Sequence, residues 1–400
     1  MGIAGKVRKK EYLETNVYDE ALERTRYIYA NFDEVVVSFS GGKDSTAVLN
    51  TTLQVARELG KLPLKVIFFD EEVIHPPTID YVRRVSQMED IDLHWYCLQL
   101  QERNGCSNEE PYWYSWDDEK EDLWVRPLPP EAITSHPKFI KGMSFQQFCL
   151  YLFDRRDGKV AMLTGIRTEE SLRRYQVIAK KKNDCYINSK SEGGKNQYRA
   201  FPIYDWSSKD VWRAVTINNW DYNRTYDVMN QTKLFNSFLT QRVCPPYGIE
   251  PIRGLWIYAE CFPEMWDKML ARVKGVATAW RYGNTELYSN ASKKPEHITF
   301  KQYMNVIIDS YNDEYQKIVK KVLNNYIKNH MKQTFDPIPE DNHHPVTGVC
   351  YMWLCMVAIK GDFKGRQSNT LRTFAQGRRE KMGISDEQAL KIYGKPVIKS

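Results

Sequence analysis

Short apolar runs alternate with amphipathic stretches over the first half of the chain. Runs rich in β-branched and aromatic residues predict strands, and apolar residues at helical spacing predict helices. The predicted strands cover residues 35–39, 65–70, 92–97, 160–164 and 198–203, and the predicted helices cover 17–31, 45–59, 77–88 and 143–153. Strands that alternate with helices indicate βαβ units. We therefore expect an α/β fold with a five-stranded parallel sheet flanked by helices.

The pattern changes beyond residue 205, where most apolar residues recur at helical spacing. Helices are predicted over 209–217, 263–273, 300–310, 314–328 and 348–360. Residues 101–142 are rich in tryptophan, proline and acidic residues, which predicts a long excursion from the sheet. We expect two domains: residues 1–230, which carry the sheet, and residues 231–400, a mainly helical C-terminal region.

Apolar segments long enough to cross a bilayer are missing from the sequence. The longest run, 351–359, has nine residues, far short of the roughly 20 that a transmembrane helix needs. The first ten residues, MGIAGKVRKK, lack the apolar stretch of a secretory signal. Eight cysteines lie scattered through 400 residues without a dense framework. We expect a cytoplasmic, reduced protein with no membrane partner.

The net charge of +6 is concentrated at the two ends of the chain. Residues 1–10 carry +4 and residues 341–400 carry +5, which leaves −3 for the middle. Basic ends could contact nucleic acid or a polyanionic partner protein, or they could be solvated tails. For a nucleic-acid partner, the basic segment 361–381 would bind phosphates, and Trp113, Trp116 and Trp124 would stack on bases.

The stretch VVVSFSGGKDSTA, residues 35–47, places Ser-Gly-Gly-Lys-Asp-Ser between a predicted strand and a predicted helix. Glycine lets the backbone approach a ligand closely, and a helix N-terminus attracts anions. Lys43 adds a positive charge, whereas Asp44 would repel a bare phosphate and so suggests a bound Mg²⁺. The Walker A pattern cannot be laid over these residues. The motif predicts a site for a di- or triphosphate with metal.

Four stretches together resemble a known family. SGGKDS at 40–45 resembles the loop of the PP-loop ATP pyrophosphatases, whose fold is that of the adenine nucleotide α-hydrolases (HUP type). FFDEEVIHPPTIDYV at 68–82, GIRTEESLRR at 165–174 and FPIYDWSSKDVWRAV at 201–215 are similar to segments of the phosphoadenosine phosphosulfate (PAPS) reductase branch. DLWVRPLPP at 122–130 and RVCPPYG with RGLW within 242–256 also resemble a subgroup described as predicted PAPS sulfotransferases.

The resemblance implies an adenine nucleotide, ATP or PAPS/APS, with its phosphates or sulfate on the loop and Asp70 near the adenosine. If residues 169–175 are helical, Glu170 and Arg174 form an i,i+4 pair. The catalytic residues that the resemblance implies are Lys43, Asp44, Arg167 and Arg174, with Asp44 as the Mg²⁺ ligand. The nucleotide-binding residues that it implies are Ser38, Ser40, Gly41, Gly42, Lys43, Asp44, Ser45, Asp70, Gly165, Arg167, Glu170 and Ser171.

The reaction follows less directly from the resemblance than the fold does. PAPS reductases carry a C-terminal Glu-Cys-Gly-hydrophobic-His segment, and the sequence here has none. Cys261 follows Glu260 but precedes Phe262 and Pro263. We therefore expect cleavage of ATP to AMP and pyrophosphate, with AMP activating an acceptor for sulfur transfer or nucleic-acid modification. The alternatives are a PAPS/APS reductase or sulfotransferase, and a nucleotide-sensing regulator without turnover.

The remaining cysteines allow a metal site as a further alternative. Cys350 and Cys355 are spaced C-x₄-C after His343 and His344, and Cys244 and Cys261 could complete a set of four ligands for zinc or an iron–sulfur cluster. The residues between Cys350 and Cys355 are typical of a core helix. Buried structural cysteines are the preferred interpretation.

Overall fold

A computed structural model describes residues 14–107, 109–153, 158–171, 174–175, 178, 186–189, 196–232, 243, 245–248, 254–282, 294, 297–311, 313–360 and 368–395. The chain divides into two compact units. Unit 1 comprises residues 1–104 and 112–274, and unit 2 comprises residues 105–111 and 275–400. The boundary in the structure falls after residue 274, whereas the sequence pattern placed it after residue 230. No helix in the described ranges is long and apolar enough to cross a membrane.

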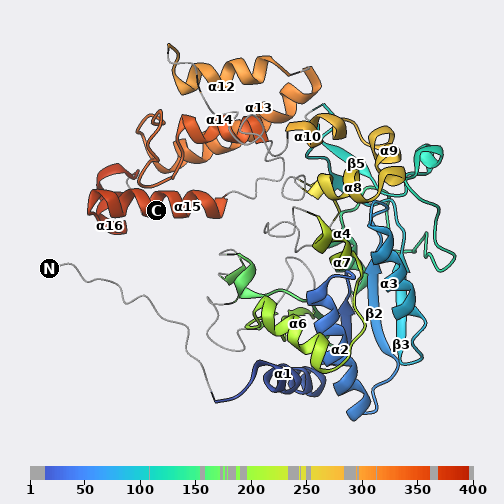
Figure 1. The fold of residues 1–400 in the computed structure, drawn as a ribbon. Helices are drawn as coiled ribbons and strands as arrows, with labels where there is room; N and C mark the ends of the chain where they lie inside the picture. The colour runs from blue at the N-terminus through green and yellow to red at the C-terminus, as the bar shows by residue number, and fades with distance from the viewer. Residues whose placement is uncertain are drawn as a thin grey trace. The chain divides into compact units, whose positions relative to one another are not determined.

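A six-stranded sheet forms the centre of unit 1, in the order β3-β2-β1-β6-β8-β7 (Figure 1). All neighbouring strands pair in parallel except β7, which is antiparallel to β8. The strands are β1 (Glu34–Ser38), β2 (Leu64–Phe69), β3 (Ile91–Tyr96), β6 (Val160–Leu163), β7 (Ile187–Ser189) and β8 (Gln197–Ala200). The five predicted parallel strands are confirmed. The prediction missed β7, because three residues beside the edge strand carry too little apolar pattern.

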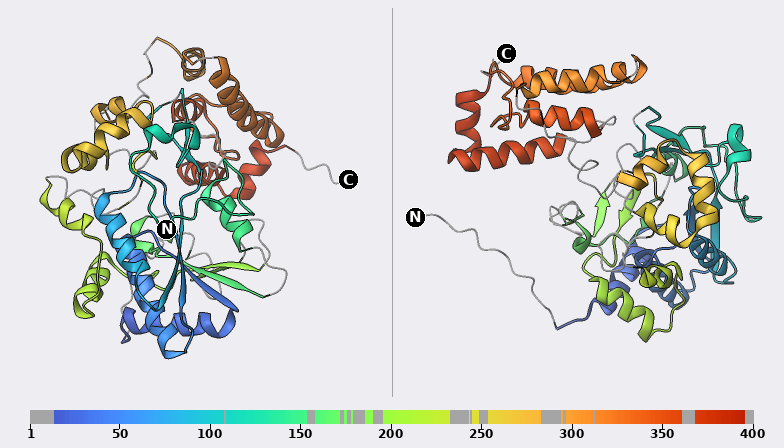
Figure 2. Two further views of the ribbon diagram at one scale, coloured as in Figure 1. Left: turned by 90° about the vertical axis from the view of Figure 1, so that its right-hand side faces the viewer. Right: turned by 45° about the horizontal axis from the view of Figure 1, so that its top comes forward.

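Helices cover both faces of the sheet, as the alternation of buried side chains requires. On β1, Val35 and Val37 pack with α1 (Val17–Asn31), α2 (Lys43–Glu58), α3 (Pro76–Ser86) and α6 (Ser208–Ile217). Val36 points to the other face and packs with α4 (Phe145–Leu152). A strand covered on both faces is apolar along its whole length, which is why 35–37 reads VVV. The blue and cyan helices α2 and α3 lie along the strands in Figure 2.

The predicted helices are present, with ends that differ by a few residues. The sequence pattern gave no signal for several short helices and for the C-terminal pair. The remaining elements of the described chain are β4 (Gln101–Arg103), β5 (Tyr112–Tyr114), the 3₁₀ helices η1 (Asp118–Leu123) and η2 (Thr168–Glu170), α7 (Thr225–Gln231), α8 (Leu255–Cys261), α9 (Pro263–Arg272), α10 (Val276–Tyr282), α12 (Phe300–Asp309), α13 (Asp313–Gln333), α14 (Tyr351–Lys360), α15 (Ser368–Met382) and α16 (Asp386–Tyr393).

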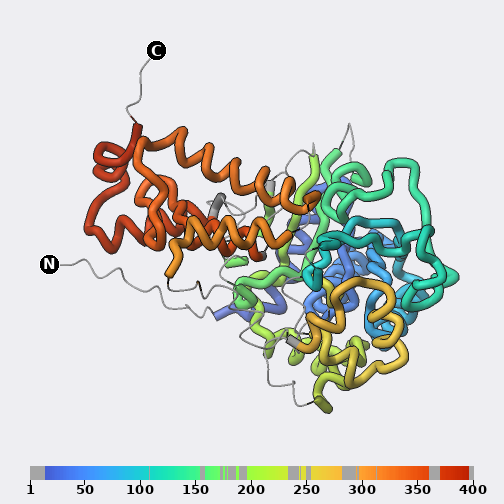
Figure 3. The backbone as a smooth tube through the Cα atoms, turned by 90° about the horizontal axis from the view of Figure 1, so that it is seen from above, coloured from blue at the N-terminus to red at the C-terminus, as the bar shows by residue number. Residues whose placement is uncertain are grey.

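Unit 2 is a helical assembly with its own apolar core. Side chains of α12, α13 and α14 form this core, and α15 contributes Leu371 to it. The orange and red helices run beside one another in Figure 3. Two arginines of the basic segment already have partners within the unit. Arg379 donates to the Pro345 carbonyl at 2.7 Å and lies 2.7 Å from Asp386, and Arg378 donates to Asn342 at 3.4 Å. These contacts occupy two of the side chains expected to bind phosphates.

The tryptophans of the excursion 101–142 lie in the interior of unit 1. Trp113 and Trp116 are buried, and Trp124 is half-buried with its ring edge-on to Trp116 at 5.3 Å. Trp116 donates its indole N–H to the Asp70 carbonyl at 2.7 Å. The interpretation of these rings as a nucleic-acid stacking surface is therefore wrong. They fill the space between the excursion and the end of β2.

A buried ion pair fastens the excursion and α9 to the same place. Glu72 is fully buried, and Arg272 donates two hydrogen bonds to its carboxylate at 2.8 and 2.9 Å. The carboxylate also accepts the backbone N–H groups of Trp116 and Val125. Glu72 has a φ of 68°, a conformation that a non-glycine residue seldom adopts. Because Arg272 closes α9, this pair explains why unit 1 extends to residue 274.

We expect Arg272→Met to destabilise unit 1 by about 3–5 kcal/mol, because it leaves the Glu72 carboxylate buried without a cation. Urea unfolding followed by tryptophan fluorescence measures the loss. The control is Arg26→Met, which breaks the exposed Arg26–Glu58 pair and should cost less than about 1 kcal/mol. The double variant Glu72→Leu/Arg272→Met should be more stable than Arg272→Met alone. Equal losses for the two single variants would contradict the role given to this pair.

Candidate functional site

The loop between β1 and α2 has the backbone geometry of an anion site. Gly41 has a φ of +70°, and a Cβ there would lie 2.8 Å from the Thr78 side chain, so only glycine fits. Gly42 is the N-cap of α2 and supplies no side-chain cap. The N–H groups of Asp44 and Ser45 belong to the first helical turn and have no intrahelical acceptor. A phosphate placed at this turn would satisfy them.

Side chains from 222–226 hold the loop from behind. Asn223 donates its amide to the Gly41 carbonyl and to Thr78, both at 2.8 Å. The Tyr226 hydroxyl accepts the Lys43 backbone N–H at 2.9 Å. The sequence analysis missed these two residues, which follow the FPIYDWSSKDVWRAV segment along the chain. A polar Asn between aromatic residues, YNRTY, was the available signal.

Asp44 lies between two cations, which changes the interpretation of the motif. The Lys43 ammonium is 3.1 Å from one carboxylate oxygen, and the Arg167 Nε donates to the other at 2.6 Å. Arg167 is 2% exposed, and its remaining N–H groups donate to the Trp206 carbonyl, Ser208 and Glu169. Arg167 therefore positions the loop through Asp44 instead of presenting a fork to a phosphate.

The same contacts bear on the predicted magnesium ion. Its only predicted protein ligand was Asp44, and both oxygens of that carboxylate have protein cations beside them. The described residues include no group of three or more His, Cys, Asp or Glu side chains arranged to hold a metal. The donor set therefore does not fit a resident Mg²⁺, and the charge of Asp44 needs no metal to balance it.

Residues after β6 close the other side of the loop. A Cβ on Gly165 would lie 2.7 Å from the Asp44 carbonyl carbon, so the backbone of the β6 end touches the first turn of α2. Residues 169–175 do not form the single helix that the sequence analysis considered, because η2 ends at Glu170 and Ser171 is extended, with φ −168° and ψ 155°, whereas Arg174 and Tyr175 are helical again. The predicted Glu170–Arg174 ion pair nevertheless forms. The Arg174 side chain in this pair is about one-third exposed, whereas that of Glu170 is mostly buried.

Asp70 serves the interior instead of an open ligand site. Its carboxylate is fully buried, accepts the Trp95 indole N–H at 2.8 Å and pairs with Arg126. It also accepts the Glu72 backbone N–H at 3.0 Å. These contacts leave Asp70 holding the turn after β2, where the resemblance implied contact with adenosine.

An apolar cavity of about 330 Å³ opens beside the loop at the carboxyl ends of β1 and β2. Open α/β sheets bind ligands at this edge, and ligand pockets usually measure about 300–1,000 Å³. Ser38 and Ser40, both predicted as nucleotide-binding, belong to its wall. The full lining is Ser38, Phe39, Ser40, Phe68, Phe69, Glu71, Ile74, His75, Phe145, Val243 and Pro245. Ser45 turns inward and donates to the Gly42 carbonyl at 2.9 Å.

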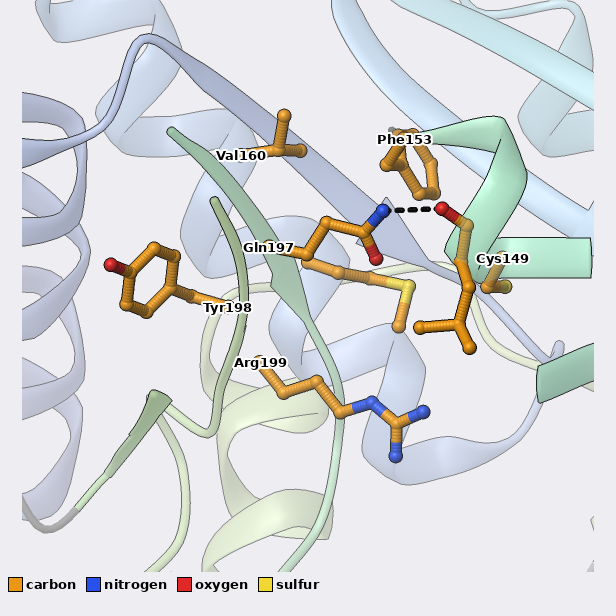
Figure 4. A pocket seen from close by; sticks show the side chains of 8 residues that line it. Cys149, Phe153, Val160, Gln197, Tyr198 and Arg199 are labelled. Atoms are coloured by element: carbon orange, nitrogen blue, oxygen red, sulfur yellow. Dashed lines mark hydrogen bonds between the residues drawn. The ribbon is translucent and has the colours of Figure 1, made fainter. Parts of the chain in front are cut away.

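A much smaller cavity lies between α4 and β8 (Figure 4). Its volume is about 20 Å³, enough for roughly one water molecule. Gln197 donates to the Leu150 carbonyl at 2.6 Å across it. Burial raises the pKa of the neighbouring Cys149 thiol to about 12, although the Arg199 charge opposes the shift. The space is too small for a substrate.

The described cysteines show no sign of catalytic or metal-binding activation. Burial raises the pKa of the Cys106 and Cys355 thiols to about 12, and it also raises the pKa of Cys97, Cys261 and Cys350. Cys261 packs beside Tyr226, Met229 and Ile257, and Cys355 donates to the Phe300 carbonyl. Cys350 lies 3.5 Å from the His343 Nδ1, which also contacts the Gly348 carbonyl. Cys244, the fourth proposed ligand, lies outside the described residues.

Comparison with known proteins agrees with the geometry of unit 1. Residues 34–232 match the phosphoadenosine phosphosulfate reductase domain, and residues 237–340 match a domain of unknown function, DUF3440. Protein YbdN of Escherichia coli K12 is 28% identical over 401 residues, covering 93% of this chain and 97% of its own. The adenosine 5′-phosphosulfate reductase of Lysinibacillus sphaericus is 25% identical, covering 53% of this chain and 76% of its own.

Two solved structures show more distant likeness. The PAPS reductase of Candida auris, in its phosphate complex, has a TM-score of 0.31 and 16% identity, covering 55% of this chain and 94% of its own. The FMN adenylyltransferase of Candida glabrata, with FAD and inorganic pyrophosphate, has a TM-score of 0.34 and 14% identity, covering 55% of this chain and 66% of its own. On the sequence match and the sheet topology, the chain belongs through residues 34–232 to the PAPS reductase-like branch of the PP-loop superfamily.

Proposed function

We propose that unit 1 binds ATP with its phosphates on the loop 40–45 and its adenosine in the cavity between β1 and β2, and that it transfers AMP to an acceptor. One observation carries the proposal: the phosphate-type loop and a nucleotide-sized cavity share Ser40 at one edge of the sheet. The loop offers N–H groups and the Lys43 charge, while the cavity offers aromatic walls. These are the two environments that a nucleotide needs.

Positioning and charge neutralisation supply the chemistry in this proposal. The loop N–H groups and Lys43 hold the β and γ phosphates, which leave together as pyrophosphate when an acceptor oxygen attacks the α phosphorus. Arg167 keeps Asp44 and the first turn of α2 in place, and Arg174 faces the developing charge. A Mg²⁺ ion, where required, arrives with the nucleotide phosphates, because the protein supplies no complete set of ligands among its described residues.

A sulfonucleotide reaction is the alternative, favoured by the Lysinibacillus relative, an adenosine 5′-phosphosulfate reductase. Thiol attack on sulfate needs an activated thiolate. Each cysteine in the described ranges has a pKa raised by burial, which is the opposite of activation. We therefore place adenylyl transfer first.

We expect Lys43→Ala to weaken ATP binding by about 1–3 kcal/mol, the usual contribution of a charge-assisted contact. Isothermal titration calorimetry measures the change, with and without Mg²⁺. Lys65→Ala is the matched control, because Lys65 lies at the start of β2 and pairs with Glu34. Thermal unfolding of both variants confirms that they are folded. Unchanged affinity in a folded Lys43→Ala protein would contradict the assignment of the loop.

We expect Gly165→Ala to weaken ATP binding at least as much, although residue 165 itself carries no charge. The added methyl group meets the Asp44 and Ser45 backbone at 2.7–2.9 Å and must push the first turn of α2 away from its position. Gly254→Ala is the control, because no atom lies within 4 Å of the place that its added methyl group would take. Calorimetry on both variants decides the point, and equal affinities would show that this contact does not shape the site.

Turnover should release pyrophosphate from ATP when the acceptor takes up AMP, and it should release AMP when a second substrate then displaces it from the acceptor. This loop type holds the β and γ phosphates as a leaving group, whereas Walker A loops serve γ-phosphate transfer. Chromatography of nucleotides and a coupled pyrophosphate assay identify the products. ADP as the product would contradict the proposal. Sulfite and adenosine 3′,5′-bisphosphate formed from PAPS would establish the sulfonucleotide alternative instead.

A further inference from the structure

Helix α13 of unit 2 (Figure 1) carries lysines that no acidic side chain balances. Beyond its first turn, residues 316–333 contain five lysines and no aspartate or glutamate. Residues that lie four or seven positions apart share one face of a helix. Four of these lysines therefore form a single row, which we call the lysine row: Lys317, Lys321, Lys328 and Lys332. All four residues are exposed, and none of their side chains has a hydrogen-bond or ion-pair partner among the described residues.

The lysine row lies opposite the face that α13 buries. At 3.6 residues per turn, each lysine of the row points away from the buried residues of the helix. Four of those buried residues pack into the apolar core of unit 2, namely Tyr315, Val319, Leu323 and Tyr326. The lysines are therefore not part of that core, and their charges face solvent.

The lysine row destabilises the helix that carries it. Lys317 with Lys321, and Lys328 with Lys332, are like-charged pairs at i,i+4, an arrangement that opposes helix formation. The helix dipole favours cations in the last turn only. It therefore compensates Lys332 but not Lys317 or Lys321, which lie in the first half of α13. A polyanion bound along the row would remove the repulsion, because its phosphates would neutralise the ammonium groups.

An aromatic ring stands in solvent where the lysine row ends. Phe335, two residues beyond the end of α13, is 79% exposed, more than any other large apolar residue in the described ranges. The Lys395 ammonium lies 4.3 Å from the centroid of this ring. The Lys395 backbone N–H donates to the Gln333 carbonyl at 2.8 Å, which fixes that residue at the helix end. One face of the ring thus meets a cation, and an unpaired base could stack on the other.

An anionic membrane surface fits these observations less well than a nucleic acid does. A helix that lies on a membrane presents a broad apolar face beside its basic face. In α13 that apolar face is already buried in the core of unit 2. The exposed apolar residues of α16, Leu390 and Ile392, are two positions apart and so lie on nearly opposite sides of their helix. They cannot enter a membrane together.

We propose that unit 2 binds single-stranded nucleic acid along α13, with the lysine row on its phosphates and Phe335 stacked on an unpaired base. The row spans about 22 Å at 1.5 Å per residue, the length of about six nucleotides of a stacked strand at 3.4 Å each. This surface differs from the basic segment 361–381 considered in the sequence analysis. The inference concerns unit 2 alone and does not depend on the proposed ATP site.

The test is fluorescence anisotropy of labelled 20-nucleotide oligothymidylate and oligouridylate, titrated with the full chain over a series of salt concentrations. We expect binding that weakens as salt rises. Changing all four lysines of the row to Gln should make the log–log salt slope shallower by about 3, because each phosphate contact on a single strand contributes about 0.7. Phe335→Ala should weaken binding by about 5-fold or more without changing the slope, because stacking releases no counterions. The ratio of the two affinities identifies RNA or DNA as the preferred strand.

The matched control removes the same charge from exposed lysines of unit 1, by changing Lys61, Lys120, Lys209 and Lys268 to Gln. It should leave the affinity and the slope nearly unchanged, and circular dichroism checks that all variants are folded. Equal losses in the two four-lysine variants would overturn the inference, because they would show a general charge effect. So would tighter binding of a 20-base-pair hairpin duplex than of either single strand. Retention of neither oligonucleotide at low salt, with or without binding to phosphatidylserine vesicles, would overturn it as well.

Discussion

The ion pair between Asp44 and Arg167 is the contact on which the site depends. It joins the first turn of α2, which follows β1, to the segment that follows β6, across the point where the strand order changes direction. Gly165 makes this approach possible, because a side chain there would collide with the backbone of Asp44. Arg167 is buried, and its guanidinium donates hydrogen bonds to four groups, one of which is the Asp44 carboxylate. The loop is therefore preorganised, so that a bound phosphate need not order it.

The acidic turn after β2 also connects distant segments of the chain through ion pairs. Asp70, Glu71 and Glu72 are consecutive carboxyl groups, and each has a different environment. Asp70 pairs with Arg126 from the excursion, and Glu72 pairs with Arg272 from α9. These two pairs bring segments distant in sequence to the end of one strand. Glu71 receives neither cation, and burial, together with the nearby carboxylates of Glu102 and Asp70, raises its pKa well above the usual value.

The sheet could be predicted because each strand is a short apolar run between helices with a clear period. The loop could be predicted because its glycines and its lysine have a specific physical use. Ion pairs between residues that lie 100 or more positions apart could not be predicted. Arg167 with Asp44 and Arg272 with Glu72 are examples, because the local sequence pattern does not show which distant charge will neutralise a buried one. Asp44 was expected to bind magnesium because the sequence did not show that Arg167 would lie beside its carboxylate. The Trp-rich excursion misled us similarly, since composition alone does not distinguish a stacking surface from a core.

Charge balance also explains how a single loop can carry an aspartate and still attract phosphate. Lys43, Asp44 and Arg167 together hold a net positive charge of one, which the half-exposed Glu169 beside Arg167 reduces, and the helix N-terminus adds a partial positive charge. Asp44 thus holds two cations at the loop, and its negative charge weakens the positive electrostatic potential that they produce. A loop built with lysine alone would have a stronger field but no connection to the β6 side of the sheet. The main effect of the Lys43-Asp44 pair is therefore to fix the position of the loop, and its effect on the local charge is secondary. Group transfer that depends on the positioning of substrates needs a loop fixed in this way.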